Sequence, residues 1–289
     1  MFLQLVASGV ANGSIYALMA LGMTILLRTT TLINFSYGEF AMGAAYLTYV
    51  ANDSFGLPYP IAILFAFALL FLIGLSVERI CIRQLGAAPH LTMTLMIVAV
   101  SFLIKGVARF FFGREFIRLP DLVEGEPIEF HDVILSPQDL LVIAASLLTV
   151  AVFFIFFEYT RFGKVMQAAS QTPRGAALTG INVPRFQGVM WGVTAVMGAI
   201  AGILIAPISL LHPEMGGKIL IKGLAAMTLG GFGSLGGAVA GGFALGILEN
   251  LAGGYVSSSL TDIAAFIVII AVLFVKPGGL FGEWKPSSV

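Results

Sequence analysis

Residues 60–78, PIAILFAFALLFLIGLSVE, contain no ionisable side chain before the last residue. A helix of this length rises about 30 Å, which is the thickness of bilayer hydrocarbon. The whole chain of 289 residues is 58% hydrophobic and 10% charged, whereas soluble domains are about 45–50% apolar and about 25% charged. The sequence therefore predicts an integral membrane protein, because so few charges cannot cover so much apolar surface in water.

Five further segments are comparably long and apolar. They predict spanning helices over residues 4–27, 91–112, 138–158, 188–210 and 259–275. Two other apolar regions are unusual: residues 35–51 are short, and residues 219–254 are too long for one crossing and are interrupted by glycines. Because lipid leaves open sheet edges without hydrogen-bond partners, we expect an all-α polytopic bundle of about eight to nine membrane segments. We expect it to fold as a single transmembrane domain over residues 1–289.

Basic residues predict the orientation of the chain, since short loops rich in Lys and Arg stay in the cytoplasm. Residues 160–187 contain Arg161, Lys164, Arg174 and Arg185 but no acidic residue, so we expect them to be cytoplasmic. The acidic loop over residues 113–137 then falls outside. This places the N-terminus outside and Lys276 and Lys285 inside, provided that residues 219–254 cross twice or form a re-entrant pair.

Lys218 and Lys222 break this charge pattern, because both fall on the external side. One hypothesis is that they attract a substrate carboxylate at the outer mouth. The alternative is that their side chains extend to lipid headgroups, as lysines near helix ends commonly do.

Residues 231–236, GFGSLG, match the GxGxxG pattern that binds dinucleotides. That interpretation needs a preceding β-strand, and the flanking LIKGLAAMTLG has no β-branched run. The same glycines form small-xxx-small rows, which favour close helix packing in lipid. The rows are Gly233–Gly237–Gly241 and Gly242–Gly246. A further hypothesis makes Gly231, Gly233 and Ser234 a break between two half-helices that lines a cavity or gate.

A second polar stretch, residues 34–46, reads NFSYGEFAMGAAY. Polar and ionisable side chains such as Asn34, Tyr37 and Glu39 cost free energy when they contact hydrocarbon. They therefore usually face an interior lined by water or protein. The local alternative is that Asn34 and Ser36 cap a short helix while Glu39 stabilises its first turn. Both roles are compatible.

The sequence lacks the motifs of ATP-hydrolysing, metal-binding and nucleic-acid-binding sites. There is no Walker A pattern, so the chain cannot hydrolyse ATP by itself. The histidines at 90, 131 and 212 are far apart, and Cys81 is the single cysteine, so we expect no metal site. A net charge of zero gives no basic face for nucleic acid. We expect neither an enzyme with catalytic residues nor a bound cofactor.

The basic segment 160–187 predicts a short helix, GKVMQAASQ, then a turn at residues 172–174, then GAALTGINV before the next span. A helix with an apolar face and a few cations suits the groove of a soluble partner. The alternative is a basic anchor on anionic lipid.

Four pieces of the sequence together are similar to one known family. They are GSIYALMALGMTILLRTTTLINFSYGEFAMGAAY, TRFGKVMQAASQTPRGAALTGINV, PEMGGKILIKGLAAMTLGGFGSLGGAVAGGFALGILEN and KPGGLFG. In order and spacing, over nearly the full chain, they resemble the permease subunits of branched-chain amino acid ABC importers, specifically the shorter leucine/isoleucine/valine type.

The resemblance implies a bacterial inner-membrane permease that moves branched-chain amino acids or related small polar compounds inward by alternating access. It also implies partners: a second homologous permease, two cytoplasmic ATPases that use the ATP, and a periplasmic substrate-binding protein. The alternative is a stand-alone secondary transporter or channel, which needs intramembrane carboxylates as an ion relay. Glu39 and Glu249 are the candidates for that relay.

The resemblance also assigns candidate sites. Gly180, Ile181 and Asn182 resemble the loop that couples to the ATPases, with Arg161, Lys164, Arg174 and Ala177 beside it. Near the translocation core, Asn34, Glu39, Gly231, Gly233 and Ser234 resemble family signatures. Tyr37 and Glu249, chosen as polar or ionisable groups inside the membrane, complete the candidate pathway residues. Tyr37 stands where many members have histidine. Gln167 and Thr172 stand where arginine and an acidic residue are common.

Overall fold

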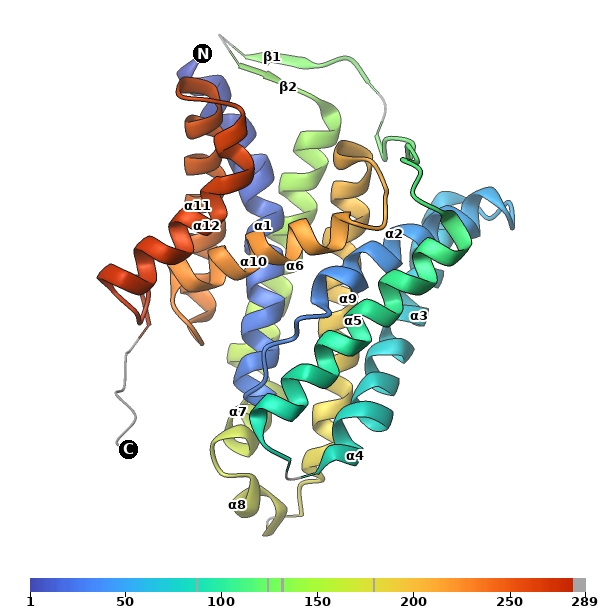
Figure 1. Cartoon of the computed structure of the whole chain (residues 1–289), viewed down its shortest axis with the longest axis vertical. Coiled ribbons are helices and arrows are strands. Elements are labelled where there is room, and N and C mark those ends of the chain that lie inside the picture. The colour runs from blue at the N-terminus through green and yellow to red at the C-terminus, as the bar shows by residue number, and fades with distance from the viewer. Residues whose placement is uncertain (87, 124, 131–132, 179, 283–289) are drawn as a thin grey trace. The chain divides into compact units, whose positions relative to one another are not determined.

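The computed structural model describes residues 1–86, 88–123, 125–130, 133–178 and 180–282. His131 and Lys285, which entered the sequence predictions, lie outside the described residues, as does the side chain of Arg174. The helices are α1 (Phe2–Thr30), α2 (Tyr37–Asp53), α3 (Tyr59–Ser76), η1 (Val77–Ile82, a π-helix), α4 (Arg83–Leu85), α5 (His90–Phe112), α6 (Pro137–Tyr159), α7 (Arg161–Gln171), α8 (Pro173–Leu178), α9 (Val183–Ser209), α10 (Met215–Gly230), α11 (Leu235–Tyr255) and α12 (Ser259–Val275) (Figure 1).

The predicted helical membrane bundle is confirmed, with changes in which helices are long. Within the described residues, six helices are long and apolar enough to cross a membrane. Five of them match predicted spans. The sixth is α11, which lies inside the region predicted to be broken, whereas the predicted span 259–275 forms the shorter α12. Region 219–254 is thus resolved into two helices, α10 and α11, joined at residues 231–234.

One departure from a purely helical chain lies in the predicted external loop. The strands β1 (Ile128–Phe130) and β2 (Val133–Leu135) form a two-stranded antiparallel sheet. Near the N-terminus, the Gln4 amide donates to the Ile134 carbonyl at 2.8 Å and accepts from the Ile134 N–H at 2.7 Å. The start of α1 and this hairpin therefore lie together, as expected if both are on one side of the membrane.

By its internal contacts, the chain forms two compact units. The terminal unit comprises Met1–Thr24, Asp121–Val150 and Ile221–Val289, and the central unit comprises Ile25–Pro120 and Ala151–Leu220. Each is described by itself below. The expectation of a single domain stays a prediction.

Close helix approach organises the central unit, where α2 and α3 both pack on α9. A Cβ atom at Gly74 of α3 would lie 2.6 Å from the Trp191 carbonyl oxygen, and one at Gly192 of α9 would lie 2.8 Å from the Phe71 ring. Gly202 of α9 likewise lies directly against the backbone of Ala41. In lipid, where apolar burial does not drive helices together, such backbone proximity maximises dispersion contacts. Trp191, Tyr37 and Phe40 are fully buried in this core.

Two glycine rows on α11 organise the terminal unit. Gly237 and Gly241 face α10, because a Cβ atom at either would overlap the Gly230 or Ala226 carbonyl oxygen. Gly242 and Gly246 instead face α1, against the backbones of Ala17 and Gly13. Each row thus allows a different neighbour to approach α11 closely.

The prediction that Gly233 belongs to the packing row is wrong. A Cβ atom added to Gly233 would meet open space within 4 Å. Its φ of +81° instead lies in the left-handed region that side chains disfavour. Gly233 is therefore part of the turn between α10 and α11.

Candidate functional site

The turn at residues 231–234 is a true helix break. Gly231 has a φ of +107°, and Ser234 begins α11 by accepting a hydrogen bond on its hydroxyl from the Gly237 N–H at 3.1 Å. On the other side of the break, the Leu280 and Phe281 N–H groups donate to the Leu229 and Gly230 carbonyls at 2.9 and 3.0 Å. The C-terminal segment therefore satisfies carbonyls that the end of a helix leaves unpaired.

The polar entry to α2 is buried. The Asn34 carboxamide oxygen accepts hydrogen bonds from the Ser36 N–H at 2.9 Å and from the Ser36 hydroxyl at 2.6 Å. The expected side-chain cap by Ser36 is wrong, because its hydroxyl bonds to Asn34 and no helix N–H donates to it. Among the described residues, neither the Asn34 amide nitrogen nor the Tyr37 hydroxyl has a partner, although both are buried. Buried polar groups of this kind are candidates for a ligand or a water.

Glu39, in the first turn of α2, belongs to a network of charges in the central unit. The Lys105 ammonium lies 3.6 Å from Glu39 and 3.1 Å from Glu214, and the Ser101 hydroxyl donates to Glu39 at 3.3 Å. Arg109 also pairs with Glu214. The network runs from a buried carboxylate to an exposed one, and its four charges balance.

Glu214 lies in the loop before α10, outside the long apolar helices. The hydrogen bond from the Arg109 guanidinium lowers the pKa of its carboxyl below the usual value, and Lys105 acts in the same direction. Glu214 is therefore held in its charged form, which keeps this loop attached to α5.

A second charge cluster lies in the terminal unit. The Lys222 ammonium on α10 donates to Glu249 of α11 at 2.5 Å and to the Tyr16 hydroxyl of α1 at 3.0 Å. The side chain of Glu249 is 2% exposed and that of Lys222 is 19% exposed. Three helices are therefore connected by one buried ion pair and a phenol.

This geometry gives Lys222 a protein partner that neither sequence interpretation included. Lys218, one turn earlier on α10, is exposed and forms no ion pair within the described part of the chain, so the outer-mouth prediction stays open for it. Glu249 was a pathway candidate, and the structure places it beside Lys222.

The predicted coupling segment is helical, as the sequence indicated. Helix α7 begins after Thr160, whose hydroxyl accepts from the Gly163 N–H at 3.2 Å. Arg161, Lys164 and Ala177 are exposed, as are Gly180 and Asn182. Asn182 begins α9 by accepting from the Arg185 N–H at 3.1 Å. Leu178, which is not among the residues predicted from the sequence, has 89% of its surface exposed.

The structure places the predicted pathway residues in two different units and gives Glu39 a contact that the sequence did not predict. Asn34, Tyr37 and Glu39 lie in the central unit, while Gly231, Gly233, Ser234 and Glu249 lie in the terminal unit. Sequence reasoning missed Lys105, the cation that neutralises Glu39. A lysine inside an otherwise apolar span was the available signal, since such residues seldom lack a partner.

Comparison with known proteins places the chain. A family model for the branched-chain amino acid transport system / permease component matches residues 5–273. The chain is 29% identical over 301 residues to the high-affinity branched-chain amino acid transport system permease protein LivH of Escherichia coli (strain K12), covering 100% of this chain and 98% of that protein. It is 26% identical over 301 residues to the corresponding protein BraD of Pseudomonas aeruginosa, with the same coverage.

An archaeal relative extends this comparison. The chain is 25% identical over 308 residues to the probable branched-chain amino acid transport permease protein LivH of Methanocaldococcus jannaschii, covering 98% of this chain and 93% of that protein. No solved structure matches the chain. Because the family model spans nearly the full length, the chain belongs to the family of permease components of branched-chain amino acid transport systems.

Proposed function

We propose that the protein is the membrane-spanning subunit of an ATP-driven importer that carries branched-chain amino acids or related small polar compounds inward by alternating access. The names of its relatives support the substrate class. In this proposal the chain itself has no catalytic role and binds no cofactor. ATP is used by two cytoplasmic ATPase subunits, a second homologous permease completes the pathway, and a periplasmic protein delivers the substrate.

The exposed coupling segment is the observation that carries the proposal. Leu178 presents a large apolar side chain to its surroundings directly after α8, and the cations of α7 lie on the same short segment. An exposed apolar anchor beside exposed charges suits insertion into a partner's groove. Motion of the ATPases would reach α9 through Asn182, which begins that helix.

The proposed topology places the protein in the bacterial inner membrane, with the N-terminus outside and the C-terminus in the cytoplasm. In this proposal the six long helices of the described residues and the shorter α2, α10 and α12 are the membrane segments. The short helices α2 and α10 span about 24–26 Å at 1.5 Å per residue, which is less than the hydrocarbon thickness. Their ends, at Asn34–Ser36 and Gly231–Ser234, would then lie at membrane depth, where irregular backbone is tolerated only beside protein or a cavity.

The rival function, a secondary transporter that uses intramembrane carboxylates as an ion relay, is less well supported. Both candidate carboxylates have a lysine within ion-pair distance: Lys105 lies 3.6 Å from Glu39, and Lys222 lies 2.5 Å from Glu249. A relay group must bind and release its ion. A carboxylate that is neutralised by a neighbouring lysine does so poorly.

Site-specific crosslinking tests the proposal. In a Cys81→Ser background, which removes the single cysteine, Ala177→Cys places a thiol on the coupling segment. We expect it to crosslink to a co-expressed ATPase subunit. Leu103→Cys, exposed on the apolar α5, is the matched control and should crosslink only to lipid.

Two readouts separate the possible failures. If Ala177→Cys and Leu103→Cys both yield only lipid adducts, the segment is a membrane anchor and the coupling role is wrong. If proteoliposomes that contain the assembled complex take up leucine without ATP, the ATP-driven mechanism is wrong and the secondary transporter is favoured.

A further inference from the structure

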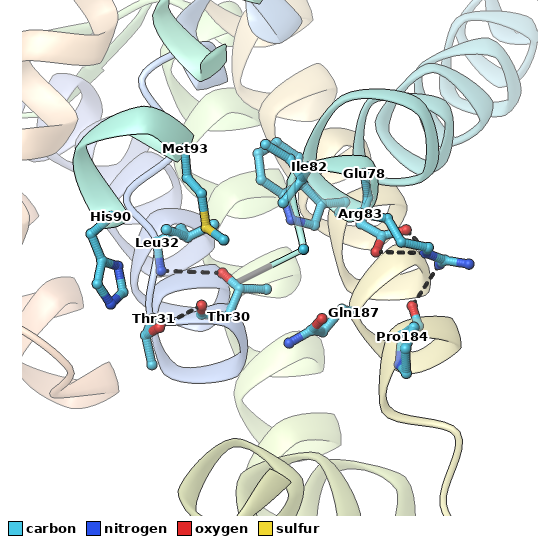
Figure 2. Close-up of a pocket in the computed structure, with 12 residues that line it drawn as sticks. Thr30, Thr31, Leu32, Glu78, Ile82, Arg83, His90, Met93, Pro184 and Gln187 are labelled. Atoms are coloured by element: carbon cyan, nitrogen blue, oxygen red, sulfur yellow. Dashed lines mark hydrogen bonds and ion pairs between the residues drawn. The ribbon is translucent and has the colours of Figure 1, made fainter. Parts of the chain in front are cut away.

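The central unit contains a cavity of about 310 Å³ that the proposed function does not use. Its lining comes from the end of α1, from η1 and α4, from the start of α5 and from the first turns of α9. Figure 2 shows Thr30, Thr31 and Leu32 on one side and Glu78, Arg83 and Pro184 on the other. The volume corresponds to about ten water molecules at ~30 Å³ each, which suits a small molecule.

An ion pair between a buried carboxylate and a partly exposed guanidinium forms one wall of this cavity. The Arg83 guanidinium donates from Nε to Glu78 at 3.1 Å and from Nη2 to Glu78 at 2.6 Å. The side chain of Glu78 is 3% exposed and that of Arg83 is 36% exposed. The wall is therefore built on an almost fully buried carboxylate, and the cation paired with it lines the cavity and is partly exposed.

The π-helix explains why Glu78 and Arg83 meet. In an α-helix, residues five apart point about 140° away from each other, because each residue turns by about 100°. The i→i+5 hydrogen bond of a π-turn, here from the Arg83 N–H to the Glu78 carbonyl, places them nearly one above the other. Gly188 of α9 leaves the necessary room, since a Cβ atom there would lie 2.9 Å from Glu78 Oε2.

The guanidinium retains hydrogen-bonding capacity. Of its five N–H donors, Nε and one Nη2 hydrogen go to Glu78, and the other Nη2 hydrogen goes to the Pro184 carbonyl at 2.7 Å. Within the described residues, no acceptor is recorded for Nη1. Trp191, which also lines the cavity, is fully buried, and its indole N–H has no acceptor in the described part of the chain. A buried donor without a partner is costly, so the Trp191 indole favours an acceptor, and the partly exposed guanidinium of Arg83 can donate from Nη1 to an anion such as a carboxylate.

The rest of the lining is complementary to the remainder of an aliphatic amino acid. Leu32, Ile82 and Met93 supply an apolar wall. Gln187, which Figure 2 shows between the two polar sides, has no hydrogen-bond partner among the described residues, so its carbonyl is available to accept from an ammonium group. Because the Glu78–Arg83 pair is already neutral, a zwitterion adds no net charge to the buried site.

We propose that this cavity binds a small aliphatic amino acid, with its carboxylate on Arg83 and Trp191, its ammonium on Gln187, and its side chain against Leu32, Ile82 and Met93. The inference rests on the proposed function for the identity of the ligand, which is the transported compound itself. The site adjoins the coupling segment, because Arg83 holds the carbonyl of Pro184, two residues after Asn182. Binding of the amino acid to Arg83 would therefore affect the hydrogen bond that holds the first turn of α9.

The test is equilibrium binding of radiolabelled leucine to the purified permease–ATPase complex in nanodiscs, without the periplasmic binding protein. We expect one saturable site. Gln187→Leu, which removes the amide at similar size, and Met93→Trp, which fills the cavity, should each weaken binding about tenfold or more. Gln84→Leu is the matched control, since Gln84 is exposed on α4 and does not line the cavity. Complex assembly, measured by size-exclusion chromatography, reports folding of every variant.

Competing ligands test the assigned chemistry. 4-Methylpentanoate lacks the ammonium and 3-methylbutylamine lacks the carboxylate, so both should compete at least about tenfold less well than leucine. If the complex takes up leucine but shows no saturable binding, or if Gln187→Leu and Met93→Trp bind like the Gln84→Leu control, the cavity inference is overturned and the proposed function stands. If uptake fails while binding still depends on Gln187, the proposed function fails and the site remains.

Discussion

The Lys222–Glu249 ion pair provides a sharp test of how the terminal unit is held together. Lys222→Met removes the ammonium that lies 2.5 Å from Glu249 and 3.0 Å from the Tyr16 hydroxyl. The carboxylate then stays buried, 2% exposed, with Tyr16 as its remaining donor at 3.3 Å. Removing one member of a buried pair costs about 3–5 kcal/mol. We expect about 3 kcal/mol, at the lower end, because the Lys222 side chain is 19% exposed.

A double-mutant cycle separates the buried charge from lost packing. In Lys222→Met/Glu249→Leu, two apolar side chains replace the pair, and such replacements are often neutral or stabilising. We therefore expect the double variant to recover most of the lost free energy of unfolding, which gives a coupling energy of about 2–3 kcal/mol. The assay is unfolding of the purified permease in mixed micelles by a denaturing detergent.

Lys218→Met is the matched control, because Lys218 is exposed one turn earlier on the same helix. We expect no measurable change in its stability. The reasoning is refuted if Lys218→Met and Lys222→Met destabilise the protein equally. It is also refuted if the double variant loses as much stability as Lys222→Met and Glu249→Leu lose together when each is made alone. Either result would mean that the pair contributes nothing specific to the association of α1, α10 and α11.

Three further predictions use other parts of the structure. Gly237→Ala should lower the free energy of unfolding by about 1–3 kcal/mol, because the added Cβ atom would overlap the Gly230 carbonyl oxygen. Gly236→Ala is the control and should be neutral or slightly stabilising, because its Cβ atom would meet open space. Equal effects of the two variants in detergent unfolding would contradict the packing row. The Arg109 guanidinium lowers the pKa of the Glu214 carboxyl in the folded protein. The ionised Glu214 should therefore contribute its full share of stability at pH values above the pKa of an unfolded glutamate, about 4.3. That share should be lost as the pH falls through the lower pKa of the folded state. Glu214→Gln should abolish that part of the acid dependence in thermal unfolding, and an unchanged profile would refute it. Leu178→Asp should reduce co-purification of the ATPase more than Arg161→Gln does. The reason is that an apolar anchor such as Leu178, which is 89% exposed, contributes more to binding of a partner than an exposed charge does. The reverse order would indicate a purely electrostatic contact.

Much of the fold was predictable because lipid imposes simple rules. Length and apolar composition placed five of the long helices, and the glycine spacing in residues 237–246 indicated close packing before any neighbour was known. The helix over the coupling segment also followed from its sequence. The span predicted over residues 259–275 forms α12 with the same bounds, and the long helix that was not predicted as such is α11, whose glycines make it look less apolar.

The polar sites were harder to predict, because local sequence does not reveal distant partners. Ser36 occupies the position before α2 as expected, yet its hydroxyl bonds to Asn34. Glu39 and Lys105 are 66 residues apart in sequence (105 − 39) and meet only because α2 packs beside α5. Glu78 and Arg83 are close in sequence, but an α-helix would separate them, and the π-turn that unites them has no signal in the residues themselves.

The amino-acid sequence by itself determined that this protein is embedded in a membrane, where five of its long helices begin and end to within a few residues, and which family it resembles. Those properties depend on local composition and on the cost of exposing backbone polar groups to lipid. Only the tertiary structure decided which charges neutralise each other, which glycines face which helix, and that a small polar cavity adjoins the start of α9. The physical reason is that an intramembrane charge needs a partner close in space, and helix packing chooses that partner from any part of the chain.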